Sequence, residues 1–151
     1  MSDLNQTYGH VICVNLMAKG KKEEQMITEA FETHIKSNVL QDLGYEFFDF
    51  HNAVKNQNYD KTNVLIAKLQ PALESLGITV QNQEDEAIEH LQKGKLGFLG
   101  DFNVEIGVIR TNCLDCLDRT NFTQSKMAMV AFDLAVTFII RKYLPIFFLV
   151  E

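Results

Sequence analysis

The sequence contains no tryptophan, only two prolines and three cysteines, and an excess of acidic over basic residues. With 14 Lys and Arg against 20 Asp and Glu, the net charge of −6 argues against non-specific nucleic-acid binding and against a broad basic membrane-binding patch. The low, odd cysteine count and the polar start of the chain predict a reducing compartment and no signal peptide. No apolar run reaches about 18 residues without interruption, so we expect no transmembrane helix.

The chain has enough apolar residues for one globular domain with a core, since 46% of its 151 residues are hydrophobic. β-branched or aromatic runs predict strands at 10–16, 45–50, 78–80 and 104–109. Apolar residues at helical spacing predict helices over 23–36 and 122–138. They predict a further helix that is capped by Asp60 or Thr62 and stops at Gly77, and Pro71 should kink this helix or split it in two. A short helix over 84–90 and a glycine-rich loop over 93–100 complete the pattern.

The alternation of strands and helices predicts an α/β fold with a mostly parallel sheet and flanking helices. In such sheets ligands gather at the carboxyl ends of the strands. Here those ends carry Lys19, then Asp49 with His51, and then the segment that follows residue 109. Three separate stretches are therefore expected to meet at one rim.

That last segment, residues 110–121, joins an apolar strand to an apolar helix and contains Cys113 and Arg119 in a Cys-x5-Arg spacing. Five residues wrap a loop so that several backbone N–H groups converge, and the following helix adds its positive end, which together make an anion site of phosphate size. The planar fork of Arg119 can hold two phosphate oxygens, and the same positive field favours a thiolate at Cys113. A thiolate held against a phosphate is a nucleophile for phosphoryl transfer.

Cys113 and Cys116 also form a Cys-x-x-Cys pair, which opens two other interpretations. A zinc site is disfavoured because no second pair follows and the four histidines are scattered. A thiol redox site fits the strand-to-helix context better, but the acidic residues near the pair are unfavourable and Arg119 would then have no function. In a milder version, Cys116 traps oxidised Cys113 as a protective disulfide.

Residues 110–121, Arg-Thr-Asn-Cys-Leu-Asp-Cys-Leu-Asp-Arg-Thr-Asn, closely resemble the signature of the SAC-domain (suppressor-of-actin) phosphoinositide phosphatases. That signature reads Arg-x-Asn-Cys-x-Asp-Cys-Leu-Asp-Arg-Thr-Asn, and every fixed position matches. The strand 11–16 with Lys19-Gly20, and Phe48-Asp-Phe-His51, resemble further segments of the family, so that the resemblance covers about residues 8–135. Residues 1–151 are accordingly identified as a single partial SAC-type catalytic domain, with an atypical apolar end over 136–151.

The resemblance implies a hydrolase that removes a phosphate from phosphatidylinositol phosphates through a phosphocysteine, with Cys113 as nucleophile. Arg119 would bind the phosphate and stabilise the transition state, or else form a structural salt bridge with Asp115 or Asp118. The remaining loop positions implied in substrate binding are Leu114, Cys116, Leu117, Asp118, Thr120, Asn112 and Asn121. Thr120 could donate to the thiolate or only cap the helix, and the two asparagines could brace the loop or serve plain turn chemistry.

The leaving inositol oxygen needs a proton, and without tryptophan there is no Trp-Pro-Asp acid loop of the tyrosine-phosphatase kind. The resemblance implies Asp115 as the acid, because a bound phosphate should raise its pKa, although Asp115 could instead only orient Arg119. Asp49 and His51 are the runners-up for the acid. Lys19 and His51 are further substrate-binding candidates, and Lys19 could equally be a solvated turn residue.

No metal or cofactor is implied. The expected partner is a phosphoinositide lipid in a cytosolic leaflet, reached through peripheral contact with the cytosolic face of internal membranes, and no protein partner is indicated. The alternative function is a truncated, catalytically weak or inactive phosphoinositide-binding fragment.

Overall fold

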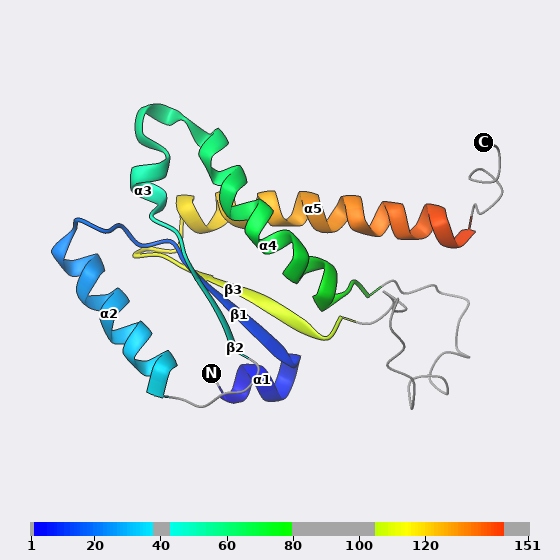
Figure 1. The fold of residues 1–151 in the computed structure, drawn as a ribbon, viewed down its shortest axis with the longest axis horizontal. Helices are drawn as coiled ribbons and strands as arrows, with labels where there is room; N and C mark the ends of the chain where they lie inside the picture. Colours follow the sequence, from blue (N-terminus) through cyan, green and yellow to red (C-terminus); the bar gives the residue numbers. More distant parts are fainter. Residues whose placement is uncertain (1, 38–42, 80–104, 144–151) are drawn as a thin grey trace.

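The computed structural model describes residues 2–37, 43–79 and 105–143 (Figure 1). Its elements, in chain order, are α1 (Ser2–Tyr8), β1 (His10–Asn15), α2 (Lys22–Ser37), β2 (Leu43–Phe47), α3 (Phe50–Ala53), the 3-10 turns η1 (Lys55–Gln57) and η2 (Tyr59–Lys61), α4 (Thr62–Leu76), β3 (Gly107–Asn112) and α5 (Asp118–Tyr143). The predicted short helix at 84–90, the loop at 93–100 and the last residues of the atypical end, 144–151, lie outside the described residues.

The three described strands form one parallel sheet in the order β2-β1-β3. β1 is suited to the central position because it has apolar residues on both faces; four of its six residues are buried and Ile12 is half-buried. Asn15, at the carboxyl end of β1, is in register with Phe47 of β2 and with Asn112 of β3. The predicted α/β class and parallel sheet are confirmed.

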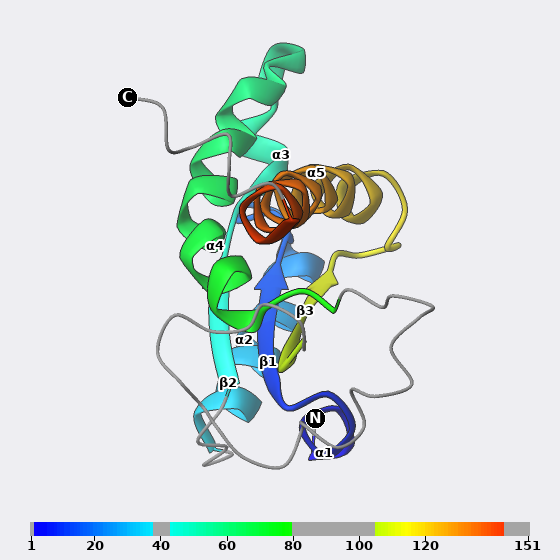
Figure 2. The same cartoon turned by 90° about the vertical axis from the view of Figure 1, so that its right-hand side faces the viewer.

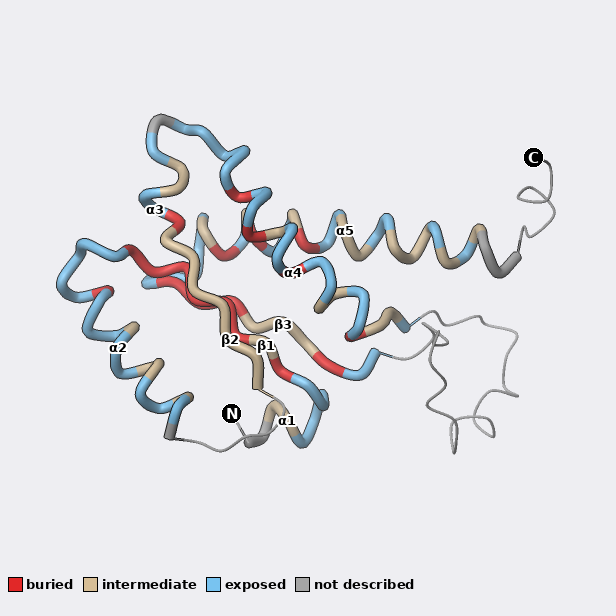
Figure 3. Tube along the Cα trace, in the orientation of Figure 1, coloured by how far each residue is buried: buried red, intermediate tan, exposed pale blue. Residues whose placement is uncertain are grey.

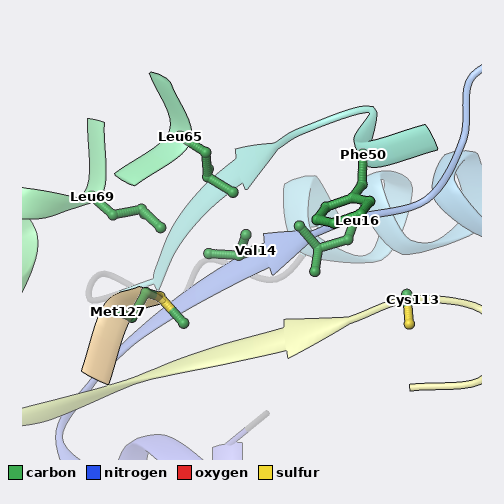
Figure 4. Close-up of a cluster of buried hydrophobic side chains, with 7 residues drawn as sticks. All are labelled: Val14, Leu16, Phe50, Leu65, Leu69, Cys113 and Met127. Carbon is green, nitrogen blue, oxygen red and sulfur yellow. The ribbon is translucent and has the colours of Figure 1, made fainter. Parts of the chain in front are cut away.

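Helices cover both faces of this sheet. Val14 and Leu16 point to the side of α4 and α5, where they form a buried cluster with Leu65, Leu69 and Met127 (Figure 4). The opposite face lies against α2, which runs along the other side of the strands in Figures 1 and 2. The Asn15 side chain donates to Thr28 Oγ1 of α2 at 3.2 Å.

Helix α5 enters the core only through its first turns. Thr120, Thr123 and Met127 are buried, whereas most residues beyond them are half-buried or exposed (Figure 3). Contrary to expectation, Asp118–Ile140 is, by length and composition alone, long and apolar enough to cross a membrane: its most apolar 18-residue window has a mean hydropathy of 1.3 and is 11% buried. A long core helix meets the same criterion, and the packed first turns of α5 belong to the core.

Several predicted element boundaries were wrong. The second strand ends at Phe47 rather than at residue 50, because the Asp49 side chain accepts the Asn52 N–H and caps α3, which starts at Phe50. Neither Asp60 nor Thr62 caps α4; the N-cap is Lys61, and buried Thr62 donates to the Tyr59 carbonyl at 2.6 Å.

The later part of α4 and its exit also differ in part from the prediction. The helix continues across Pro71 without being split, and it ends at Gly77 with φ of 79°, as predicted. Ile78 and Thr79 are not in a strand, and the third strand spans Gly107–Asn112 rather than 104–109. The order of β1, α2, β2, α4, β3 and α5 agrees with the prediction, whereas α1 and α3 were not predicted. That order positions the loop after β3.

Candidate active site

The carboxyl ends of β1 and β3 bring two distant stretches of the chain together. The Leu16 N–H donates to the Asn112 carbonyl at 2.9 Å, and the Asn112 side-chain amide donates to Asn15 Oδ1 at 3.1 Å. The same Asn15 oxygen accepts the Met17 N–H at 3.2 Å. The buried Asn112 side chain therefore braces the start of the loop, which is one of the two roles predicted for it. That Asn112 contacts the substrate stays a prediction.

Cys113 lies directly after β3 with its side chain buried, at 4% exposure of the residue. Three groups surround its sulfur: the Cys116 N–H at 3.1 Å, the Thr120 hydroxyl at 3.2 Å and Asp115 Oδ1 at 3.5 Å. The first can donate to an anionic sulfur, and the hydroxyl can either donate or accept. Cys113 also belongs to the buried apolar cluster of Figure 4, so its sulfur has polar contacts from the loop at the edge of the core.

The loop between β3 and α5 has one strained residue. Cys116 has φ of 55°, in the left-handed region that non-glycine residues seldom adopt, and this conformation accompanies the N–H contact with the Cys113 sulfur. Both cysteines are free thiols. The side chains of Leu114 and Leu117 are 50% and 60% exposed, so the loop presents apolar groups on its outer side.

Asp115 turns back onto its own loop. Its Oδ1 accepts the Leu117 N–H at 3.1 Å and faces the Cys113 sulfur at 3.5 Å. The hydrogen bond from the Leu117 N–H is the largest cause of a lowered pKa at Asp115. Desolvation opposes it, whereas the Cys113 contact and the positive charge of Arg119 lower the pKa further. The protein's own groups therefore act in the opposite direction to the effect expected from a bound phosphate.

Arg119, in the first turn of α5, does form an ion pair, but neither Asp115 nor Asp118 is the partner. Its guanidinium meets the Glu24 carboxylate with Nη1 at 2.6 Å and Nη2 at 3.3 Å, and Nη1 also reaches the Leu16 carbonyl at 3.3 Å. This pairing with Glu24 raises the pKa of Arg119. Glu24 was missed as a site residue, because in the sequence it is one of two adjacent glutamates that suit the first turn of a helix.

The remaining predicted loop positions lie at the start of α5. Asp118 begins the helix and Asn121 donates its N–H to the Leu117 carbonyl at 2.9 Å; both are exposed. Thr120 is buried, and its hydroxyl contacts the Cys113 sulfur rather than serving only as a cap.

The third stretch approaches this rim through Lys19. The Lys19 N–H donates to Asp49 Oδ2 at 3.0 Å, and the Lys19 ammonium lies 4.9 Å from the centre of the Phe47 ring. Burial works against ionisation of Asp49, but hydrogen bonds from Asn52 and Lys19 outweigh it and the pKa is lowered. Asp49 thus serves as a helix cap, and His51 is exposed on α3 next to it.

Comparisons with known proteins agree with the signature. A family model described as the SacI homology domain matches residues 1–55. Phosphoinositide phosphatase SAC8 of Arabidopsis thaliana is 33% identical over 132 residues, which are 87% of this chain and 20% of the relative. Phosphatidylinositol-3-phosphatase SAC1 of Drosophila melanogaster is 35% identical over 80% of this chain and 18% of the relative. Synaptojanin-1 of Rattus norvegicus is 33% identical over 83% of this chain and 7% of the relative. The chain thus spans a fifth or less of each of these relatives.

Proposed function

Since this chain belongs to the SAC-domain family and carries part of a SAC domain, we propose that it is a phosphoinositide phosphatase with Cys113 as its nucleophile. The observation that carries the proposal is the placement of the Cys113 sulfur, between Cys116 N–H at 3.1 Å and Thr120 hydroxyl at 3.2 Å, in a loop that begins a helix. An anion-binding loop and a cysteine sulfur placed inside it are the two requirements of a phosphocysteine mechanism.

In the proposed reaction, the Cys113 thiolate attacks the phosphorus in line and the bond between phosphorus and the inositol oxygen breaks. Asp115 gives its proton to the departing oxygen, which leaves as the inositol hydroxyl. A water molecule then attacks the phosphocysteine, its proton returns to Asp115, and inorganic phosphate leaves with the thiolate restored. Loop N–H groups and Arg119 stabilise the charge on the phosphoryl oxygens in both steps.

The position of Asp115 suits the transfer of a proton in this cycle. Asp115 Oδ1 and the Cys113 sulfur are 3.5 Å apart, so two full negative charges there would repel each other, and a proton on one of them removes the repulsion. A phosphate dianion bound in the loop adds to the repulsion and favours the protonated carboxyl. Asp115 would then hold the proton at the moment when the leaving oxygen requires it.

A lipid substrate requires the rim to meet a membrane surface, at the cytosolic face of internal membranes in our proposal. Lys19 and Lys21 are exposed on the turn after β1, and Lys22 is exposed at the start of α2. Exposed Leu114 and Leu117 lie on the loop after the adjacent β3. Lysines attract anionic headgroups while leucines favour the acyl boundary, so this local cationic and apolar rim offsets the net charge of −6.

The test is phosphate release by the 151-residue chain from vesicles that contain monophosphorylated phosphatidylinositols. We expect Cys113→Ser to reduce release by at least about 10³-fold, because a serine hydroxyl ionises far less readily than a cysteine thiol and is a much weaker nucleophile. Cys13→Ser, which changes the buried cysteine of β1 outside the loop, serves as the matched control and should retain turnover where the chain stays folded.

The outcomes separate the two functions named for this chain. Undiminished release by Cys113→Ser would exclude the cysteine mechanism. Tight binding of the vesicles without any release by the wild-type chain would instead identify a phosphoinositide-binding fragment.

A further inference from the structure

Arg119, the proposed phosphate-binding residue, is paired with the buried carboxylate of Glu24, which lies outside the Cys-x5-Arg loop. Glu24 is on the first turn of α2, and its side chain is 1% exposed. Oε2 accepts the Ala18 N–H at 2.7 Å and Arg119 Nη1 at 2.6 Å, while Oε1 accepts Arg119 Nη2 at 3.3 Å and lies 3.5 Å from the Lys21 ammonium. Both oxygens are thus occupied by donors, as a buried carboxylate requires.

These hydrogen bonds occupy one end of the Arg119 guanidinium and leave one of its edges available for a ligand. Nη1 donates to Glu24 and to the Leu16 carbonyl, and Nη2 gives one N–H to Glu24. An arginine has five N–H donors in a fixed planar fork. Among the described residues, these contacts use three of them. The other two, Nε–H and the second N–H of Nη2, project side by side and match two oxygens of a phosphate.

We propose that Glu24 is a positioning residue of the phosphatase: it holds the end of the Arg119 guanidinium so that the Nε–Nη2 edge is presented to the substrate phosphate. This inference rests on the proposed function. The anchor is rigid because Glu24 is itself tied to the backbone at Ala18, on the segment that leaves β1. Without it, Arg119 would have to lose side-chain entropy at the moment of binding.

A competing role for Glu24 makes the opposite prediction. If the carboxylate were merely an electrostatic competitor of the phosphate, removing its charge would strengthen phosphate binding. In the positioning role, removal of the charge weakens binding, since Glu24→Gln also places an amide N–H against one of the donors that now meet the carboxylate.

The first experiment measures binding of inorganic phosphate and of orthovanadate to the folded 151-residue chain by calorimetry. We expect Glu24→Gln to weaken binding at least tenfold and Glu23→Gln, on the exposed neighbouring position, to change it less than twofold. In an Arg119→Met background, Glu24→Gln should cause no further loss, because its effect acts through Arg119. Equal or tighter binding by Glu24→Gln than by the wild type, or no phosphate binding by the wild type, would overturn the proposal.

A second measurement uses only the wild-type chain and decides the question if Glu24→Gln fails to fold. Phosphate added to chain labelled with ¹⁵N and ¹³C should shift the Arg119 Nε–H signal and leave the Glu24 carboxyl signal in place. Movement of the Glu24 signal, as the carboxylate is displaced, would contradict a positioning role. The chain could bind phosphate as expected and yet release no phosphate from lipid vesicles. That result would contradict the proposed function but would leave the assignment of Glu24 intact.

Discussion

At the scale of single residues, the loop combines groups that sequence inspection proposed with one that it did not. Asp115 and Thr120 both lie within hydrogen-bonding reach of the Cys113 sulfur, and the three residues fall within a stretch of eight. The fourth predicted residue, Arg119, is held by an ion pair with Glu24, which lies 95 positions away in the chain and was not predicted. Two predictions follow at this scale, one for each carboxylate.

Replacing Asp115 tests whether it is the acid or only orients Arg119. Asp115→Asn keeps an oxygen for the Leu117 N–H but has no proton to give at neutral pH. We expect kcat for lipid substrates to fall about 10²–10⁴-fold, and the loss to be much smaller for an aryl phosphate whose leaving group needs no proton. Steady-state assays measure kcat for both substrates, with Asp133→Asn on α5 as the control. An equal loss of kcat for the two substrates would instead support the orienting role.

Glu24 predicts how the stability of the fold depends on pH. Its hydrogen bonds from Arg119 lower the pKa from 4.5 to about 2 against the effect of burial. A carboxyl whose pKa is depressed in the folded state stabilises that state fully above its unfolded pKa and loses this effect as the pH falls toward the folded pKa. Between pH 5 and pH 2 the free energy of unfolding should therefore drop by up to about 3 kcal/mol through this group.

Urea unfolding at pH 6, 4 and 3 measures this dependence. In Glu24→Gln the dependence should be flatter than in the wild type, while Glu23→Gln should follow the wild type. Parallel pH profiles for all three chains would show that Glu24 does not titrate with folding.

At the scale of elements, the position of the loop depends on close pairing of β1 with β3. A Cβ on Gly107 would lie 2.4 Å from the His10 carbonyl oxygen and 2.5 Å from a Leu76 methyl carbon. The first of these neighbours is backbone and cannot move without separating the strands. The absence of a side chain at Gly107 is therefore a condition for the register that places Asn112 beside Asn15.

Gly107→Ala should destabilise the fold by about 1–3 kcal/mol, as overpacking of a closed contact does. Gly44→Ala on β2 is the matched control, because its new methyl would approach only the Ile12 side chain, at 3.1 Å, which can adjust. Urea denaturation midpoints of the two variants provide the measurement; a Gly107→Ala midpoint equal to that of Gly44→Ala would contradict the proposed tight approach.

At the scale of the whole molecule, the chain is a partial domain with apolar surface that its described part leaves uncovered. Met129, Phe132 and Ile139 of α5 are between 41% and 67% exposed, beyond the turns that pack on the sheet. The segment that matches this chain makes up 20% or less of each relative. Exposed apolar side chains of this size favour association.

We expect the chain to self-associate at micromolar concentration in solution through this part of α5. The double variant Met129→Ser and Phe132→Ser should shift sedimentation toward the monomer, whereas Ala128→Ser, a small exposed position on the same helix, should not. Analytical ultracentrifugation measures the difference. A wild-type chain that sediments as a monomer at all concentrations would contradict the expectation.

The sequence by itself determined the class of the fold and which residues the loop contains. Both are local in the chain: Cys113 and Asp115 lie in the loop after a β-branched run, Thr120 lies in the first turn of the helix that follows, and alternating elements suffice to predict a parallel sheet. Only the tertiary structure decided which groups hold that loop in place. The bonds between Asn112 and Asn15 and between Arg119 and Glu24 join residues 97 and 95 positions apart, and the end of β2 was misjudged because the Asp49 cap competes with an aromatic strand pattern. Long-range partners are chosen by strand register and burial, which no local pattern contains.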